Sequence, residues 1–288
     1  MTREESRRTL LGGLGTAAIG ALAGCVSVGD GVTEEISRTY ETEQLTVETR
    51  VGDLTVDTAD RDDVLVEGER QANDEDQLDE LTLEAERNGD SLALRVQGNT
   101  DASGLLFGST PRIDLNVTVP SSVAVARLET NTGDLTAATG DTETDVETNT
   151  GDIQVTDGVA EVRTNTGDVE TGDAATPTGV RTNTGDLSVE DGRMLRQVDT
   201  DTGDVEVGFP ALDGDVSIDT DTGDVALRVA PELDVTADAE SSTGDVTGAG
   251  QFEAVAQRSG RFEGTLGDGT HRVRVRSSTG DVTVEVFD

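Results

Sequence analysis

The segment VETNTGDIQV, residues 146–155, alternates in polarity on both sides of a Gly-Asp pair. Before the pair, Val146, Thr148 and Thr150 share one face of an extended chain, and the residues between them face the other way. After the pair, Ile153 and Val155 resume the apolar face. The β-branched residues suit a pleated surface, glycine accepts a positive φ, and aspartate can bond the turn backbone. The segment therefore predicts two short strands joined by a Gly-Asp corner.

This element recurs along the second half of the chain. Gly-Asp pairs follow one another at spacings of 18, 16, 18, 18, 20, 21 and 36 residues. They are Gly133-Asp134, Gly151-Asp152, Gly167-Asp168, Gly185-Asp186, Gly203-Asp204, Gly223-Asp224, Gly244-Asp245 and Gly280-Asp281. A degenerate copy at 259–262 divides the last gap, which predicts nine units, and residues 51–54 (VGDL) are a candidate outlying tenth.

A fixed period of this length is typical of a repeat architecture. We expect an all-β fold in which repeats of about 16–21 residues stack as a parallel β-solenoid, because one repeat cannot bury its apolar row alone. The same alternation also fits an alternative, stacked antiparallel hairpins with Thr-Gly as the loop. Near-identical units at near-constant spacing favour the solenoid, and threonine suits the first position of a primed turn poorly.

The chain divides into four predicted parts: a signal peptide (1–24), a polar tether (25–39), a non-repeat β region that caps the solenoid (40–125) and the Thr-Gly-Asp repeats (126–288). In the cap, strands are predicted at 45–47, 64–66 and 113–120. A hairpin is predicted at Asn88-Gly89-Asp90, between 81–83 and 92–94. Residues 74–79 are expected to form a polar loop, and residues 98–110 a second loop that carries Leu105, Leu106 and Phe107.

The first residues predict export. Arg7 and Arg8 introduce a twin-arginine signal, followed by a mild apolar stretch over residues 10–23 that is too short to span a bilayer. The stretch ends in LAGC at 22–25, which is similar to a lipobox, and Cys25 is the only cysteine. We expect Cys25 to carry the lipid that anchors the protein on the outer face of the cell membrane.

The charge is strongly acidic: 60 Asp and Glu oppose 21 basic residues, all of them arginine, for a formal net charge of −39. This balance excludes general nucleic-acid binding, which needs a basic footprint. It indicates a halophilic protein whose carboxylates keep it hydrated in concentrated salt. A cation-binding surface is the competing interpretation.

The strand ending in Pro120 and the repeats that follow it resemble a large family of exported β-strand-repeat proteins. The family is classed as a domain of unknown function and carries an adhesin label, and the likeness covers roughly residues 45–288. Together with the signal, the chain resembles a haloarchaeal twin-arginine lipoprotein of that family. The resemblance implies a surface protein with a solenoid-like fold, and it supplies no catalytic residue.

Candidate sites are few. His271 is the only histidine, and no free thiol, nucleophile elbow, phosphate loop or His/Cys metal spacing accompanies it. The repeated aspartates should align in a stacked fold, with a second column from Asn131, Asn149, Asn165 and Asn183 that continues in Asp201 and Asp221. Oxygen-only ligands suit Ca²⁺ or Mg²⁺. The calcium candidates are Asp186, Asp204 and Asp224, although loosely held Ca²⁺ or Mg²⁺ fits better than a specific site, and no cofactor is expected.

The leading hypothesis is therefore a non-catalytic, lipid-anchored surface protein with an adhesin-like or envelope-structural role, whose partner is an envelope glycan or a surface protein. The second is a divalent-cation-dependent surface or carbohydrate-binding module. The third is a carboxylate-dependent polysaccharide enzyme. The sequence indicates no oligomeric state.

Overall fold

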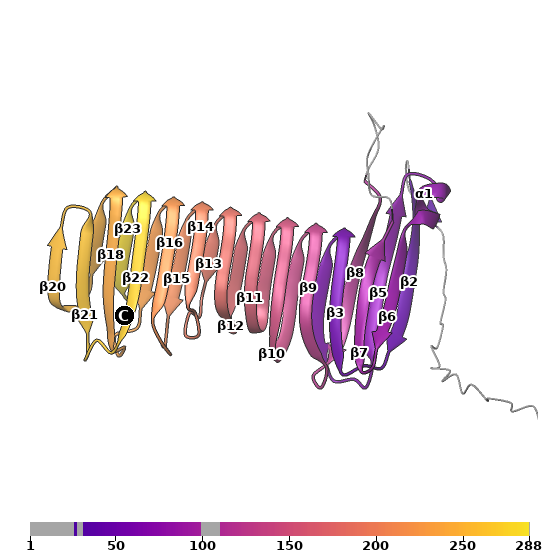
Figure 1. Ribbon diagram of the computed structural model, residues 1–288, viewed down its shortest axis with the longest axis horizontal. Coiled ribbons are helices and arrows are strands. Elements are labelled where there is room, and N and C mark those ends of the chain that lie inside the picture. Colours follow the sequence, from indigo (N-terminus) through magenta and orange to yellow (C-terminus); the bar gives the residue numbers. More distant parts are fainter. Residues whose placement is uncertain (1–25, 28–30, 99–109, 288) are drawn as a thin grey trace, which may run out of the picture.

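The computed structural model describes residues 26–27, 31–98 and 110–287. Its strands stand side by side in a long row, with the N-terminal strands at one end and β20 (Glu253–Arg258) at the other (Figure 1). One helix, α1 (Glu75–Glu80), lies at the N-terminal end. Each turn of the repeats, here called a rung, places one strand before its Gly-Asp corner and one after it. The rungs thus build two sheets that enclose the core.

The first sheet contains the strands that precede the corners. Its order in space is β6 (Thr82–Asn88), β7 (Ser91–Gln97), β3 (Gln44–Val51), β9 (Ala124–Thr132), the second halves of β10 (Leu135–Thr150), β11 (Ile153–Thr166) and β12 (Val169–Thr184), then β14 (Gln197–Thr202), β16 (Val216–Thr222), β22 (His271–Thr279), β18 (Val235–Thr243), β21 (Arg261–Leu266) and β20.

The second sheet contains the strands that follow the corners. Its order is β1 (Val26–Ser27), β2 (Val32–Tyr40), β5 (Val64–Ala72), β8 (Arg112–Pro120), β4 (Leu54–Ala59), the first halves of β10, β11 and β12, then β13 (Leu187–Val189), β15 (Val205–Phe209), β17 (Val225–Val229), β23 (Val282–Val286) and β19 (Val246–Ala249).

The pairing from rung to rung is parallel and in register. Val146 lies beside Val162 in the first sheet, and Ile153 beside Val169 in the second. The predicted parallel β-solenoid is therefore confirmed, and the alternative of hairpins stacked at the Thr-Gly pairs is wrong. The repeats favour the solenoid because equivalent residues fall next to one another and form continuous ladders.

The predicted alternation produces the core, with one difference. Val146, Ile153 and Val155 are almost completely buried, and so is the Thr148 side chain. Thr150, expected on the same face, is exposed. It directly precedes the glycine corner, where the chain leaves one sheet for the other and no opposite strand covers it.

The last rung does not lie last in the stack. Strand β22, which leads to Gly280-Asp281, pairs with β16 on one side and with β18 on the other. Strand β23 likewise lies between β17 and β19. The chain thus builds the rung of Gly244-Asp245 first and then returns to fill the space beside Gly223-Asp224.

The predicted ninth unit is wrong. Ser259 and Gly260 join β20 to β21 in an antiparallel hairpin, and β21 pairs antiparallel with β18. Gly260 has a positive φ of 70°, but no aspartate follows it and the corner does not form. The hairpin closes the far end of the first sheet. By contrast, the candidate unit at 51–54 is part of the stack, since Leu54 pairs with Leu135.

Two predictions for the N-terminal part are also wrong. Within the expected tether, residues 32–40 form β2, which pairs with β5 over its whole length, and Ile36 and Tyr40 pack against the core. The expected polar loop contains α1, whose N-cap Asp74 accepts a hydrogen bond from the Gln77 backbone N–H at 2.8 Å.

The predicted strands of this part and the predicted hairpin are confirmed. The hairpin at Gly89 joins β6 to β7, and the strand before Pro120 is β8. Arg7, Arg8 and Cys25, and the loop residues Leu105, Leu106 and Phe107, lie outside the described residues. Over the part of the chain that is described, no helix combines the length and apolar character needed to cross a bilayer.

Candidate functional site: an aspartate ladder and the groove beside it

The corners bring successive rungs unusually close together. The eight repeat glycines have φ between +140° and +149°, a region that L side chains rarely adopt. A Cβ added to Gly185 would lie 2.0 Å from the carbonyl oxygen of Gly167 in the neighbouring rung, and the same contact recurs at the other corners. Backbone conformation and stacking distance therefore both require glycine.

Three hydrogen bonds join each corner to the next. At one of them, Gly185 donates its N–H to the Thr202 carbonyl at 2.9 Å, and Leu187 donates to the Asp204 carbonyl at 2.8 Å. The third bond involves a side chain. Asp204, on the neighbouring rung, donates its backbone N–H to the carboxylate oxygen Oδ1 of Asp186 at 2.8 Å. The aspartate side chain thus satisfies the one corner amide that faces no carbonyl.

This bond repeats along the stack and forms an aspartate ladder. In each step the N–H of one aspartate donates to Oδ1 of the one before, at 2.7–3.0 Å. The ladder runs in space through Asp114, Asp53, Asp134, Asp152, Asp168, Asp186, Asp204, Asp224, Asp281 and Asp245.

The ladder is longer than the sequence predicted. Asp53 belonged only to a candidate unit, and Asp114 was not expected at all, because no glycine precedes it. A signal for Asp114 does exist in the alternating strand at 113–119, which continues the apolar row of the repeats. Apart from Asp114, which is half-buried, the ladder aspartates are exposed, so their second carboxylate oxygens are available to solvent.

An open groove of about 890 Å³ runs beside the ladder over the second sheet. It is lined by the ladder aspartates from Asp134 to Asp281 and by residues of the strands that follow the corners, among them Thr136, Gln154, Glu170, Ser188, Glu206 and Thr283. The groove is elongated, acidic and continuous over several rungs.

A second polar column lies on the first sheet, two residues before each glycine. Asn165 donates to Oδ1 of Asn149 at 2.7 Å, Asn183 donates to Asn165 at 3.3 Å, and Asn149 donates to Asn131. Asp201 and Asp221 continue the column, and they border a hollow of about 510 Å³ together with Arg181 and Arg276. The sequence predicted this column, and the structure shows that its amides bond to one another.

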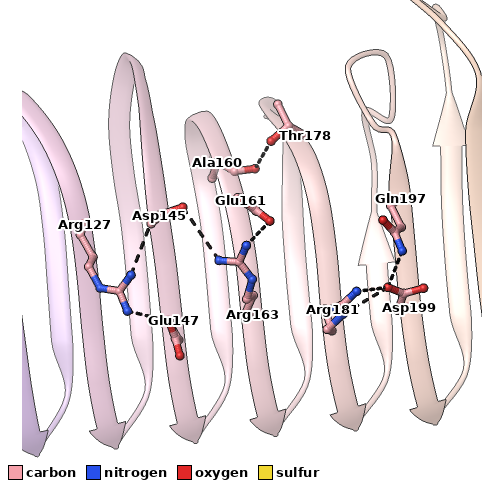
Figure 2. A network of polar contacts seen from close by, with 10 residues as sticks. All are labelled: Arg127, Asp145, Glu147, Ala160, Glu161, Arg163, Thr178, Arg181, Gln197 and Asp199. Carbon is pink, nitrogen blue, oxygen red and sulfur yellow. Dashed lines mark hydrogen bonds and ion pairs between the residues drawn. The ribbon is translucent and has the colours of Figure 1, made fainter.

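On the outer face of the first sheet, arginines form ion pairs with carboxylates (Figure 2). Arg127 reaches Glu147 at 2.7 Å and Asp145 at 3.8 Å, and Arg163 contacts Asp145 and Glu161. The pairs with Asp145 and Glu147 join neighbouring rungs, whereas Arg163 and Glu161 belong to the same strand.

The same pattern continues further along the sheet, where Arg181 donates to Oδ2 of Asp199 at 3.1 Å through its Nε. The hydrogen bond to Asp199, with the charge of that carboxylate, raises the pKa of the Arg181 guanidinium. Gln197 also donates to Oδ2 of Asp199, at 2.8 Å (Figure 2). Asp145, Glu147 and Asp199 on this face thus have cationic partners, whereas the ladder carboxylates from Asp53 to Asp281 accept backbone amides.

In the described ranges, no three His, Cys, Asp or Glu side chains converge in a way that would hold a metal ion. The calcium candidates Asp186, Asp204 and Asp224 are successive members of the ladder, and each has Oδ1 engaged by an N–H. His271 begins β22, and its backbone N–H donates to the Asp234 carbonyl at 3.0 Å.

Comparison with known protein families gives a match over most of the chain. The family model Toastrack DUF4097 matches residues 42–285. No relative is found among the curated proteins.

Several solved structures are similar over most of their length. A "putative adhesin" from Bacteroides fragilis shares 12% identity with a TM-score of 0.46, and the alignment covers 88% of this chain and 97% of that one. A "putative cell adhesion protein" from Clostridium sporogenes shares 10% identity (88% and 100% covered; TM-score 0.26). A "putative lipid binding protein" from Parabacteroides distasonis shares 11% (90% and 98% covered; TM-score 0.34). None of these likenesses is close enough to bear on function.

Proposed function

Since this chain belongs to the Toastrack DUF4097 family, we propose that it is a non-catalytic protein of the cell surface, held by a lipid on Cys25, with an adhesin-like or envelope-structural role. The observation that carries the proposal is the continuous groove along the aspartate ladder, which extends over several rungs. A surface of this form suits an extended partner, such as an envelope glycan or a surface protein.

The length of the stack would place its far end well away from the membrane. The first sheet has thirteen strands in the described chain. At about 4.8 Å between strands, these span roughly 60 Å. Cys25 precedes Val32 by only seven positions, and β2 lies at the N-terminal end of the stack (Figure 1). A lipid on Cys25 would hold that end near the membrane and leave the end formed by β20 outermost.

A divalent-cation-dependent role is the second candidate, favoured by the acidic lining of the groove. Ladder carboxylates in successive rungs, joined there by Glu170 and Glu206, attract Ca²⁺ or Mg²⁺ from solution. Because each ladder Oδ1 already accepts an N–H, we propose loose condensation in preference to a specific site. Calorimetric titration with Ca²⁺ in concentrated NaCl separates the two: a saturable site with defined stoichiometry would contradict condensation.

Anchoring is tested by replacing Cys25 with serine. The variant should leave the membrane fraction, because no helix of the described residues is long and apolar enough to hold the protein in a bilayer. If it still sediments with membranes after a high-salt wash, the lipid anchor is refuted.

Binding is tested with the same released protein, labelled and applied to cell envelopes. Ser188→Arg fills the groove with a long side chain and should reduce binding several-fold. Ser217→Arg, on the outer face of the first sheet, is the matched control and should bind as the parent does. Equal binding by the two variants would remove the groove from the proposal.

A further inference from the structure

The two sheets end differently at the far end of the stack. Among the described strands, the second sheet ends with β19, which belongs with β18 to the rung of Gly244-Asp245, here called the terminal rung. The first sheet continues beyond β18 with β21 and β20, and both of these pair antiparallel (Figure 1). Because a Gly-Asp corner joins two strands of one rung, a further rung would need two sheet edges at the same level. The antiparallel hairpin removes that arrangement.

An aromatic ring from this hairpin takes the place of a core side chain in the terminal rung. The position four residues after each corner glycine is buried, and in the other rungs it carries Ala137, Val155, Thr171, Val189, Val207, Leu227 and Val284. In the terminal rung this position is Gly248. A Cβ there would lie 2.0 Å from Cε2 of Phe262 on β21, whose side chain is buried. Phe252 packs edge-on against that ring, with 5.2 Å between the centroids. Phe262 thus reaches from the first sheet to the second and fills the end of the core.

A side chain of the hairpin also covers part of the free edge of β19. The Asp245 carbonyl points toward β23, where it accepts the Val282 N–H at 2.9 Å. Successive carbonyls of a strand point to opposite sides, so the Val246 carbonyl points to the free edge. Gln257 on β20 donates to that carbonyl from Nε2 at 3.3 Å. The hairpin therefore occupies a backbone acceptor that would otherwise be open to another strand.

The charge of the protein alone does not keep two copies apart in concentrated salt. In dilute buffer the formal net charge of −39 makes copies repel one another. At about 1 M salt the screening length falls to about 3 Å, and the repulsion acts only near contact distance. An open rung end, with two free strand edges and an apolar core between them, would then be a surface on which copies assemble.

We propose that the hairpin of β20 and β21 is an assembly stop, which keeps copies of this protein from joining at their far ends in concentrated salt. It covers the end of the core with Phe262, engages the β19 edge through Gln257 and leaves the two sheets unequal in length. Its own outer edge, β20, is short and interrupted by the register shift between Glu253 and Ala256, which makes it a poor template for pairing. This role is separate from the groove and from the lipid anchor.

The test is deletion of residues 252–266 from the full chain carrying Cys25→Ser. Six residues, 250, 251 and 267–270, would still connect β19 to β22, as many as connect β15 to β16. In molar NaCl the parent should sediment as a monomer. At the same protein concentrations the deletion variant should associate, reversibly on dilution and well below its melting temperature.

A pair of glycine substitutions tests the same role without shortening the chain. Gly248→Val restores the kind of side chain that the other rungs carry, and it would displace the Phe262 ring. This variant should therefore also associate in molar NaCl. Gly172→Val, in an interior rung, is the matched control, because a Cβ there meets its nearest neighbour, the Thr156 carbonyl oxygen, at an ordinary 3.6 Å. The control should remain a monomer.

A buried control separates the stop from a general loss of stability. Phe209→Ala removes a fully buried ring from the middle of the stack, so it should melt earlier than the parent without associating. A parent that associates in molar NaCl, a deletion variant that folds and stays monomeric, or a Gly248→Val variant that sediments as the controls do would each overturn the proposal. If circular dichroism shows that the deletion variant does not fold, the glycine pair decides alone. None of these results bears on membrane anchoring, which the Cys25→Ser fractionation tests separately.

Discussion

The backbone N–H of Asp186 donates to Oδ1 of Asp168 at 2.8 Å, so a charged side chain of one rung completes the backbone of the next. The resulting row of like charges is stabilised by amides in place of cations. Two opposing effects therefore act at every corner: the hydrogen bond that each carboxylate accepts, and the repulsion between neighbouring carboxylates.

Substitutions at Asp186 separate these effects. Asp186→Ala removes the acceptor for the Asp204 N–H and should cost about 0.5–2 kcal/mol, as loss of a helix N-cap does. Asp186→Asn keeps an oxygen acceptor, removes the charge and should stay within about 1 kcal/mol of the parent. Thermal or denaturant melts measure both. Equal losses for the two variants would show that charge, and not the acceptor, matters at this position.

Substitution of a corner glycine such as Gly185 is expected to destabilise the fold more than substitution elsewhere on the same rung. Gly185→Val combines a positive φ of 147° with a Cβ that would lie 2.0 Å from the Gly167 carbonyl oxygen, and should cost about 3 kcal/mol or more. Asn183→Ser is the control on the outer face of the same rung. It loses one long amide bond and should cost roughly 0.5 kcal/mol or less. Similar melting shifts for the pair would remove the structural role given to the glycine.

Salt should raise the stability of the folded state. At a rung spacing of about 4.8 Å, neighbouring carboxylates in water repel by about 0.9 kcal/mol. Summed over the ladder and reduced by side-chain splay, this is roughly 5 kcal/mol. Near 1 M salt the screening length falls to about 3 Å and most of the repulsion disappears.

The measurement is a series of thermal melts from millimolar to molar NaCl. The midpoint should rise along the series. A flat midpoint would contradict both the repulsive ladder and the halophilic interpretation. A falling midpoint would show that the arginine ion pairs of the first sheet, such as Arg127 with Glu147, outweigh the ladder.

Truncation after residue 270 should damage the stack from within. It removes β22 and β23, which separate β16 and β17 from β18 and β19. We expect residues 235–266 to become sensitive to proteases while the rungs before Phe209 stay protected. Mass spectrometry of a limited digest reports the boundary. If 235–266 remains protected, β18 can pair directly with β16 and the inserted rung is dispensable.

The strands and corners of each rung could be predicted because they depend on residues close together in the sequence. The alternation around Val146, the corner at Gly151 and the hairpin at Gly89 all depend on neighbours in the sequence. The order of the rungs at the far end could not be predicted from the sequence. The strands β16, β18 and β22 carry similar rows of apolar residues, so any of them could pair with any other. Which of them becomes adjacent is decided by the connecting segments and by the hairpin of β20 and β21.

The missed N-terminal elements have a different cause. Strand β2 is polar on much of both faces, since it lies near the edge of the second sheet, so its pattern resembles a tether. The short helix α1 depends on the Asp74 cap, which a polar loop would also contain. The aspartate column itself was predictable from the spacing, but its hydrogen bonds were not, because they join residues of different rungs.

The position of β22 and β23 inside the stack also determines when the molecule can finish folding. Rungs up to Asp224 can add one upon another as the ribosome releases them, in the order of synthesis. The far end cannot, because a gap stays open until residues 271–288 have left the exit tunnel. Closing that gap is a non-local event between segments already in place, so it should be the slow, late step of maturation. While residues 271–288 are still inside the ribosome, the nascent chain is thus incomplete in its interior, and not only at its tip.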